Sequence, residues 1–167
     1  MPFVNSFAPL ADQNARTLVL GSMPGEASLQ AGEYYAHPRN AFWPIMGQLL
    51  GFEPSLQYAE RIRCLMRARV AVWDVLASCH RVGSLDSEID DASVSVNDFD
   101  QFFRQHPQIR SVFFNGTKAE NSFRKWVLPQ LPGLTLELTR LPSTSPANAS
   151  LSLEKKRRAW EAIVGPT

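Results

Sequence analysis

The sequence contains few cysteines and has almost no net charge. Its two cysteines, Cys64 and Cys79, are too few for a disulfide framework, a structural zinc site or an iron–sulfur cluster. We expect both to be buried free thiols in apolar surroundings. The net charge of 167 residues is only +1, so no overall field attracts a nucleic acid or a membrane surface. An anionic ligand would have to be bound by local patches.

Long apolar runs are also missing. No stretch is long enough to span a bilayer, and the first residues lack the basic and apolar blocks of a signal peptide. We therefore expect a cytoplasmic protein with no membrane partner. The apolar fraction of 44% and the charged fraction of 20% are ordinary for a globular protein, and the length suits one domain over residues 1–167.

A segment of unusual composition follows the first predicted strand. The apolar run 17–20 stops at Gly21, and a long stretch rich in Gly, Pro, Tyr, His and Asn precedes a helical pattern that starts near Ala41. Long loops in compact domains are usually functional or disordered, and aromatic residues with few charges argue against disorder. A strand that ends in Gly-x-x-Pro-Gly places backbone N–H groups at the carboxyl edge of a sheet, where open α/β sheets bind ligands.

Helical patterns alternate with short apolar segments along the rest of the chain. Further strands are predicted at 70–76, 109–114 and 135–141, the last at or near a sheet edge because its residues alternate. Helices are predicted at 42–50, at 55–69, after a cap at Asn97, around 118–127, and in the basic segment that contains Lys155, Lys156, Arg157 and Arg158. Residues 78–96 are interpreted as a surface loop. This order predicts an α/β fold, a three-layer α/β/α sandwich with a central four-stranded, mainly parallel sheet.

Such a topology brings four stretches to one edge of the sheet, because parallel strands end on the same side. They are residues 21–25, 74–78, 115–118 and 143–148. Three of the four contain small residues with hydroxyl or amide groups. That composition favours hydrogen bonding to a ligand over burial of an apolar one.

Two blocks of the sequence resemble a known family. Gly-Ser-Met-Pro-Gly at 21–25, followed by Tyr-Ala-His-Pro-Arg-Asn-Ala-Phe-Trp at 35–43, is similar to the first signature of the uracil-DNA glycosylase superfamily. The segment Ser-Thr-Ser-Pro-Ala-Asn-Ala at 143–149 takes the place of the last motif of that superfamily. The resemblance is strongest to the deoxyinosine (hypoxanthine-DNA) glycosylases and extends to the related mismatch-specific enzymes.

The differences from the family pattern concern the residue that positions the attacking water. In the uracil-specific and mismatch-specific branches, Asp, Glu or Asn precedes the proline of the first motif, whereas Met23 stands here. The deoxyinosine branch also lacks that residue, and its catalytic side chain is the Asn of the His-Pro-x-Asn segment. Carried over by resemblance, the catalytic residue is Asn40.

The resemblance also implies which residues bind the base and the DNA. Tyr35 is expected to stack on a base that is flipped out of the helix, and backbone N–H groups near Ser22 are expected to donate to a purine carbonyl. The residues expected to bind the base are Ser22, Met23, Pro24, Gly25, Tyr35, Asp74 and Asn115. Those expected to contact DNA are Arg39, Lys118, Ser143, Ser145, Ala147 and Asn148.

Each of the main assignments has a purely structural alternative. Asn40 also suits a helix cap, Tyr35 also suits packing, and Asp74 is either an acceptor for a purine N–H or a cap on a neighbouring turn. Asn115 is followed by Gly116, which is first of all a turn signal. The basic run at 155–158 is either a solvated helix face or a contact to phosphates.

The sequence therefore predicts a monofunctional DNA glycosylase that flips out a deaminated base, hypoxanthine in the first place, and hydrolyses its N-glycosidic bond. It needs no metal or other cofactor, its partner is double-stranded and also single-stranded DNA, and it acts as a monomer. Two alternatives remain open: a mismatch-specific uracil-DNA glycosylase, and a module that binds DNA lesions without catalysis.

Overall fold

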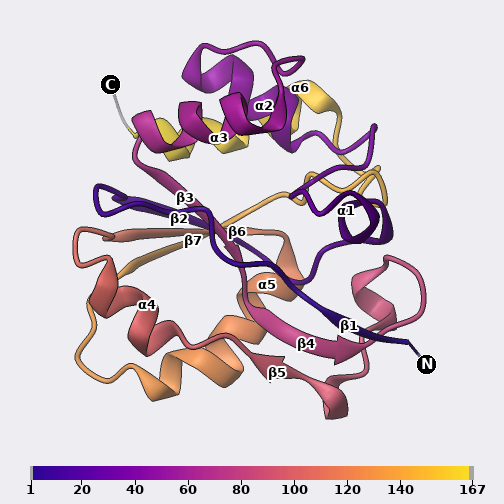
Figure 1. Cartoon of the computed structure of the whole chain (residues 1–167), viewed down its shortest axis with the longest axis vertical. Helices are drawn as coiled ribbons and strands as arrows, with labels where there is room; N and C mark the ends of the chain where they lie inside the picture. The colour runs from indigo at the N-terminus through magenta and orange to yellow at the C-terminus, as the bar shows by residue number, and fades with distance from the viewer. Residues whose placement is uncertain (1, 166–167) are drawn as a thin grey trace.

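The computed structural model describes residues 2–165, which are organised around a central four-stranded sheet (Figure 1). Its strands are β2 (Thr17–Gly21), β3 (Val70–Asp74), β6 (Ser111–Asn115) and β7 (Glu137–Leu141). They lie in the order β3-β2-β6-β7, all pairs are parallel, and β7 is an edge strand as predicted. The predicted fold class is thereby confirmed.

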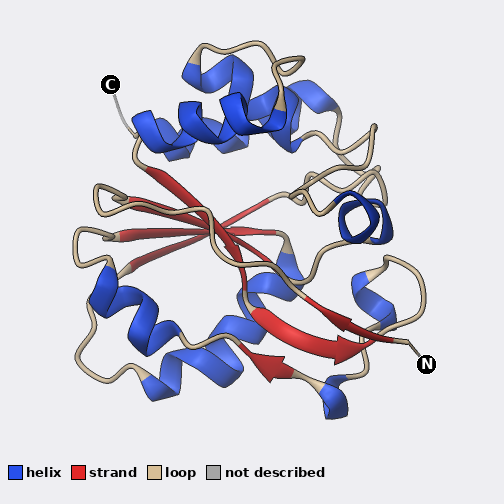
Figure 2. Ribbon diagram, in the orientation of Figure 1, coloured by secondary structure: helices blue, strands red, loops and turns tan. Residues whose placement is uncertain are grey.

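Helices cover both faces of this sheet, which makes the three layers visible in Figure 2. One face carries α2 (Phe42–Leu50), α3 (Tyr58–Arg67) and α6 (Leu153–Trp160), and the other carries α4 (Phe99–Gln105) and α5 (Thr117–Ser122). After α5 the chain continues through η3 (Phe123–Val127) and η4 (Leu128–Gln130), and α6 continues into η5 (Glu161–Val164).

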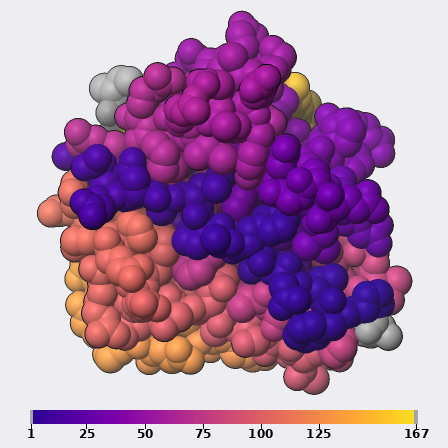
Figure 3. Space-filling view, in the orientation of Figure 1, coloured from indigo at the N-terminus to yellow at the C-terminus, as the bar shows by residue number. Residues whose placement is uncertain are grey.

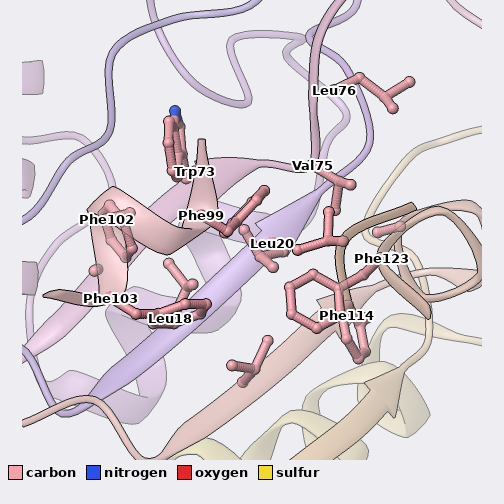
Figure 4. Close-up of a cluster of buried hydrophobic side chains, with 14 of the residues drawn as sticks. Leu18, Leu20, Trp73, Val75, Leu76, Phe99, Phe102, Phe103, Phe114 and Phe123 are labelled. Carbon is pink, nitrogen blue, oxygen red and sulfur yellow. The ribbon is translucent and has the colours of Figure 1, made fainter. Parts of the chain in front are cut away.

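Alternation along the strands builds a separate core on each face. Leu18 and Leu20 of β2 point to the α4 and α5 face, whereas Val19 between them joins the core under α2, α3 and α6. Figure 4 shows the first of these cores, in which Trp73 packs against Phe99 and Phe102 at ring distances of 4.9 and 4.8 Å. Burial on both faces explains why these strands are almost continuously apolar in the sequence.

A second, antiparallel sheet was not predicted. It consists of β1 (Phe3–Asn5), β4 (Leu76–His80) and β5 (Ser95–Val96), in the order β1-β4-β5. The predicted strand 70–76 is wrong in its end, because the chain leaves the central sheet after Asp74 and enters β4 at Leu76. The predicted loop 78–96 is wrong in part, since it contains most of β4, the turns η1 (Asp86–Glu88) and η2 (Asp91–Ser93), and β5. Strands this short have too few residues to show the two-residue alternation of apolar and polar side chains that identifies a strand.

Four smaller predictions also differ from the structure. The segment after β2 includes a short helix, α1 (Glu26–Ala31), and α3 is shorter than the predicted 55–69. Asp98 caps α4 by accepting a hydrogen bond from the backbone N–H of Gln101 at 3.0 Å, while the Asn97 amide donates to the carbonyl of Asp74 at 2.7 Å. Cys79 is buried, but Cys64 is only half-buried and accepts a contact from the Arg67 guanidinium at 3.3 Å.

The start of α2 matters most for the site. Pro44 lies in its first turn, where a missing N–H costs little, and Gly51 ends it with a φ of +81°. Figure 3 shows that the N-terminal residues run across the surface between the helices of one face and the elements below the sheet. Among residues 2–165, no helix combines the length and apolar character needed to cross a membrane.

Candidate functional site

A pocket of about 420 Å³ opens at the carboxyl edge of the central sheet. Residues from all four of the stretches that were predicted to converge lie in its wall. The predicted site residues that line it are Ser22, Met23, Gly25, Tyr35, Asn40, Asp74, Asn115, Ser143, Ser145, Ala147 and Asn148. The sequence therefore predicted where the pocket lies and most of what surrounds it.

The first loop forms one wall through its backbone and two side chains. Met23 is 7% exposed, lines the pocket and packs in the hydrophobic core beneath it, at the position where other branches of the resembled family carry an acid or amide. Gly25 is approached closely, because a Cβ there would lie 3.4 Å from the Ser84 side chain. Pro24 does not line the pocket, and its carbonyl instead accepts a hydrogen bond of 2.6 Å from the Arg81 guanidinium.

Asn40 serves the start of α2 and also borders the pocket. Its Oδ1 accepts a hydrogen bond of 2.9 Å from the backbone N–H of Phe42, which fixes the orientation of the amide. Its NH₂ group makes no hydrogen bond within the described part of the chain and remains available to a ligand. The N-cap of α2 is Ala41, not Asn40, so Asn40 supports the start of the helix from one residue before the cap, and its catalytic assignment stays a prediction.

Tyr35 lies beside the pocket in an unusual backbone conformation. Its φ of +55° belongs to the left-handed region, which non-glycine residues rarely adopt and which is found preferentially at functional sites. One face of its ring stacks on Phe42 at 4.1 Å, so that face is not available to a base. Its hydroxyl oxygen is buried and has no hydrogen-bond partner in residues 2–165, and burial raises the pKa of Tyr35 above its ordinary value.

Asp74 is the buried carboxyl group of the site. It ends β3, is 3% exposed, and its Oδ2 also has no hydrogen-bond partner among the described residues. Burial, and secondly the negative charge of Asp86, raise the pKa of Asp74 to about 7, while Arg81 acts in the opposite direction. Both forms of the carboxyl group are therefore present near neutral pH.

Asn115 is held by the loop that follows β7. Its Nδ2 donates to the Thr144 hydroxyl at 2.9 Å, and its Oδ1 accepts from the Thr144 backbone N–H at 2.9 Å. Both residues are buried, so this reciprocal pair fixes the last loop against the end of β6. Gly116 allows the contact, because it has a φ of +95° and a Cβ there would lie 3.1 Å from Ser143.

The last loop is ordered by its own polar side chains. The Ser143 and Ser145 hydroxyls accept hydrogen bonds from the backbone N–H groups of Ser145 and Ala147, at 3.1 and 3.2 Å. The Asn148 amide donates to the carbonyl of Ser143 at 3.2 Å, and Lys156 donates to the carbonyl of Asn148 at 2.7 Å. Lys156 is therefore neither solvated nor free for phosphates: it is 6% exposed, and burial lowers its pKa.

Two of the predicted DNA contacts lie outside the pocket. Arg39 is exposed beyond its rim, and Lys118 forms an ion pair of 2.5 Å with Asp91. The other two basic residues near the last loop, Arg157 and Arg158, pair with Glu154 on their own helix. The assignments of Arg39 and Lys118 to DNA binding stay predictions.

Sequence reasoning missed one wall of the pocket. It consists of Ser84, Leu85, Asp86 and Ser87, which lie in the segment interpreted as a surface loop. The Ser22 hydroxyl donates to Asp86 at 2.5 Å, and the Ser84 hydroxyl accepts from the Glu26 N–H at 2.8 Å. Arg81, 1% exposed, holds this wall to the first loop by donating to the carbonyls of Gly83 and Pro24. The available signal was its small polar composition, which matches that of the other walls.

Comparison with known proteins agrees with this architecture. The chain matches the family described as Uracil DNA glycosylase superfamily over residues 8–164. It is similar to the protein named Hypoxanthine DNA glycosylase of Methanosarcina acetivorans, with 34% identity over 158 residues, covering 94% of this chain and 95% of that protein. The protein of the same name from Methanosarcina barkeri is 34% identical over 155 residues, covering 92% and 93%.

A solved structure shares the fold as well. It is a solution NMR structure from Methanosarcina acetivorans, described as that of a proposed uracil DNA glycosylase, with a TM-score of 0.82 and 33% identity over 98% of this chain and 97% of that one. The parallel sheet, the pocket at its carboxyl edge and these matches lead to one conclusion. The chain belongs to the uracil DNA glycosylase superfamily.

Proposed function

We propose that this protein is a monofunctional DNA glycosylase that removes hypoxanthine, the base of deoxyinosine, and leaves an abasic site. The observation that carries the proposal is Asn40, an oriented amide with a free NH₂ group that borders the pocket in a chain with Met23 at the usual catalytic position. The two relatives named Hypoxanthine DNA glycosylase, which match almost the whole chain, support the same base.

The pocket suits the chemistry of base excision. Cleavage of an N-glycosidic bond passes through an oxocarbenium-like sugar while electron density accumulates on the departing base. The base has to be held outside the duplex, and donors have to face it. A volume of about 420 Å³ with polar groups at its floor is of the size and character of a site for one small ligand.

In this proposal each side chain of the pocket has its own role in base excision. The second lone pair of Asn40 Oδ1 orients the attacking water, and its NH₂ group donates to the base. Tyr35 offers its other ring face for stacking. The Ser22 hydroxyl is engaged with Asp86, so the backbone N–H groups of the first loop supply the donors to the purine carbonyl.

Met23 favours hypoxanthine over uracil as the substrate. Met23 lines the pocket, and a thioether cannot orient a water as an acid or amide does. A uracil-excising enzyme of the usual arrangement would need that group, whereas the proposed arrangement relies on Asn40.

The DNA is proposed to be a duplex that contacts the rim of the pocket. Ser143, Ser145, Ala147 and Asn148 form that rim on one side, and Arg39 lies beside it. The protein acts as a cytoplasmic monomer, one domain over residues 1–167, in this proposal.

The test is an alkali-cleavage assay on duplexes that carry one inosine, uracil or xanthine. We expect excision of hypoxanthine well above that of uracil. Asn40→Ala should lower the single-turnover rate by about a hundredfold or more, because a positioned donor and water anchor is lost. Gln48→Ala, which removes an exposed amide from the same helix, is the matched control and should leave the rate unchanged.

Two results would contradict the proposal. Binding of the inosine duplex without any cleavage would identify a lesion-binding module. A loss of about 1 kcal/mol in stability for Asn40→Ala with an unchanged rate would identify Asn40 as a helix cap only.

A further inference from the structure

Two buried oxygens in the pocket have no hydrogen-bond partner within residues 2–165, Oδ2 of Asp74 and the hydroxyl of Tyr35. Buried polar groups are nearly always paired, because an unpaired one loses its hydration without compensation. Both residues line the pocket, so a ligand that enters it can supply the missing partners. The Asp74 carboxyl group is thus placed to contact a base that is bound in the pocket.

The backbone beneath the pocket is shaped around this carboxyl group. A Cβ at Gly21 would lie 2.5 Å from Asp74 Oδ1 and 3.0 Å from the Tyr35 hydroxyl. A residue with a side chain at position 21 would collide with the carboxyl group. Gly21 therefore allows Asp74 to lie flat against the end of β2, at the floor of the pocket.

The charges around Asp74 favour its neutral form. Asp86 from η1 brings a second carboxylate to the same pocket. Within the described residues, no ion pair links Asp74 to a lysine, arginine or histidine side chain. Arg81, the nearest cation, donates instead to the carbonyls of Pro24 and Gly83.

The other titratable neighbours do not change charge near neutrality. Tyr34 and Tyr35 interact with Asp74, and burial raises the pKa of each above its ordinary value of 10.0, so both stay neutral. Burial and Asp86 raise the pKa of Asp74 to about 7. A buried carboxyl group whose charged form is disfavoured by its surroundings is a recurring arrangement for acid catalysis.

We propose, on the basis of the function proposed above, that Asp74 is the catalytic acid that gives its proton to the purine base as the base leaves. This reverses the role of acceptor expected from the sequence. An amide such as that of Asn40 can donate a hydrogen bond but cannot transfer a proton, so Asp74 supplies what the rest of the pocket lacks.

The step balances without any further reactant. The carboxyl proton of Asp74 moves to a ring nitrogen of the purine, N7 or N3, while the electron pair of the C1′–N9 bond moves onto the base. Hypoxanthine leaves as a neutral molecule, and water adds to C1′ of the oxocarbenium ion. The proton released by that water returns to the Asp74 carboxylate, directly or through solvent, and the net reaction is hydrolysis.

The first test is the pH dependence of single-turnover excision from an inosine duplex. In the wild-type protein the rate should be constant below about pH 7 and fall about tenfold per pH unit above it, as the acid is lost. Asp74→Asn keeps the shape and the hydrogen-bonding capacity, and should lower the rate below pH 7 by about a hundredfold or more. Its remaining rate should not depend on pH.

A second variant tests the same idea without changing Asp74. Asp86→Asn keeps an acceptor for the Ser22 hydroxyl and removes the neighbouring negative charge, so the alkaline limb should move to lower pH. Glu88→Gln removes an exposed charge from the same turn outside the pocket and should leave the profile in place. Duplexes with 7-deaza- or 3-deaza-deoxyinosine show whether N7 or N3 of the purine accepts the proton. The analogue that lacks the accepting nitrogen should be excised at the same rate by the wild type and by Asp74→Asn, whereas the other analogue should be excised more slowly by Asp74→Asn.

The possible outcomes separate the two proposals. No excision of hypoxanthine by the wild-type protein would remove the proposed function. Excision with a wild-type rate in Asp74→Asn, or with an unchanged alkaline limb in that variant, would remove the catalytic acid and leave the function intact. If Asp74→Asn does not fold, the test rests on Asp86→Asn. A pH–rate profile of Asp86→Asn whose alkaline limb lies at the same pH as in the wild type would overturn the proposal.

Discussion

Two pairs of polar side chains lie at the same pocket, and they differ in whether their hydrogen bonds are satisfied. Asn115 and Thr144 are joined by two hydrogen bonds of 2.9 Å, so each satisfies the other. Asp74 and Tyr35 both lie close to the position that a Cβ of Gly21 would take, and each keeps a buried oxygen without a partner in the described residues. We expect the first pair to stabilise the fold and the second pair to lower its stability.

This difference predicts that mutations in the two pairs change the free energy of unfolding in opposite directions. The largest change should come from Asp74. An exposed carboxyl has a pKa of 3.8, and burial raises the pKa of Asp74 to about 7 in the folded protein. The folded state therefore holds this proton more tightly than the unfolded state, and the stability that the neutral carboxyl contributes is lost as pH rises from about 4 to about 7.

Asp74→Asn should remove this pH dependence. Relative to the wild type, its free energy of unfolding should increase by about 1.4 kcal/mol per pH unit across that window, or about 4 kcal/mol in total, and should level off above it. Urea unfolding of both proteins at a series of pH values gives the difference. A constant offset at all pH values would mean that Asp74 is not perturbed.

The second-largest change in stability should come from the hydrogen-bonded pair of Asn115 and Thr144. Asn115→Ala removes both hydrogen bonds and leaves the buried Thr144 hydroxyl and N–H unpaired, so we expect a loss of about 3 kcal/mol in the free energy of unfolding. Thr144→Val removes only the hydroxyl contact and should lose about half as much. Both follow from denaturant titration at neutral pH. A cost below about 0.5 kcal/mol for Asn115→Ala would show that the pair does not fix the last loop.

The smallest effect should come from the Tyr35 hydroxyl. Tyr35→Phe removes a buried oxygen without a partner, so stability should be unchanged or higher by up to about 1 kcal/mol. Binding of the inosine duplex should weaken if the hydroxyl meets the base. Ser122→Ala is the matched control: its Oγ is also buried without a partner in residues 2–165, but it lies outside the pocket, and DNA binding should not change. Destabilisation by Tyr35→Phe would reveal a structural role for the hydroxyl.

Much of the fold was predictable because its signals are local. The central strands are continuous apolar runs, β7 alternates, and Pro44 and Gly51 mark the first turn and the end of α2. The first and last blocks of the pocket were also recognisable, because their small polar residues directly follow parallel strands. Parallel topology alone then places them at one edge of the sheet.

The errors have physical reasons as well. The end of β3 was misplaced because apolar residues continue from the central sheet into β4 without a break, and only the hydrogen bonds show where one sheet ends. Arg81 and Lys156 are charged residues that the sequence assigns to the surface or leaves without comment, yet both are buried and donate to backbone carbonyls of pocket loops, Arg81 to Pro24 and Lys156 to Asn148. Such partners have no local signature.

The sequence by itself determined the alternation of strands and helices, the edge at which the pocket forms, and the presence of Met23 where other branches of the superfamily carry an acid or amide. These depend on residue types and on spacing within one element. Only the tertiary structure decided that the wall containing Asp86 closes the pocket, that Asn115 is bound by Thr144, and that Asp74 Oδ2 is buried without a hydrogen-bond partner in residues 2–165. Those properties arise between segments far apart in the chain, because burial and charge act through space and not along the sequence.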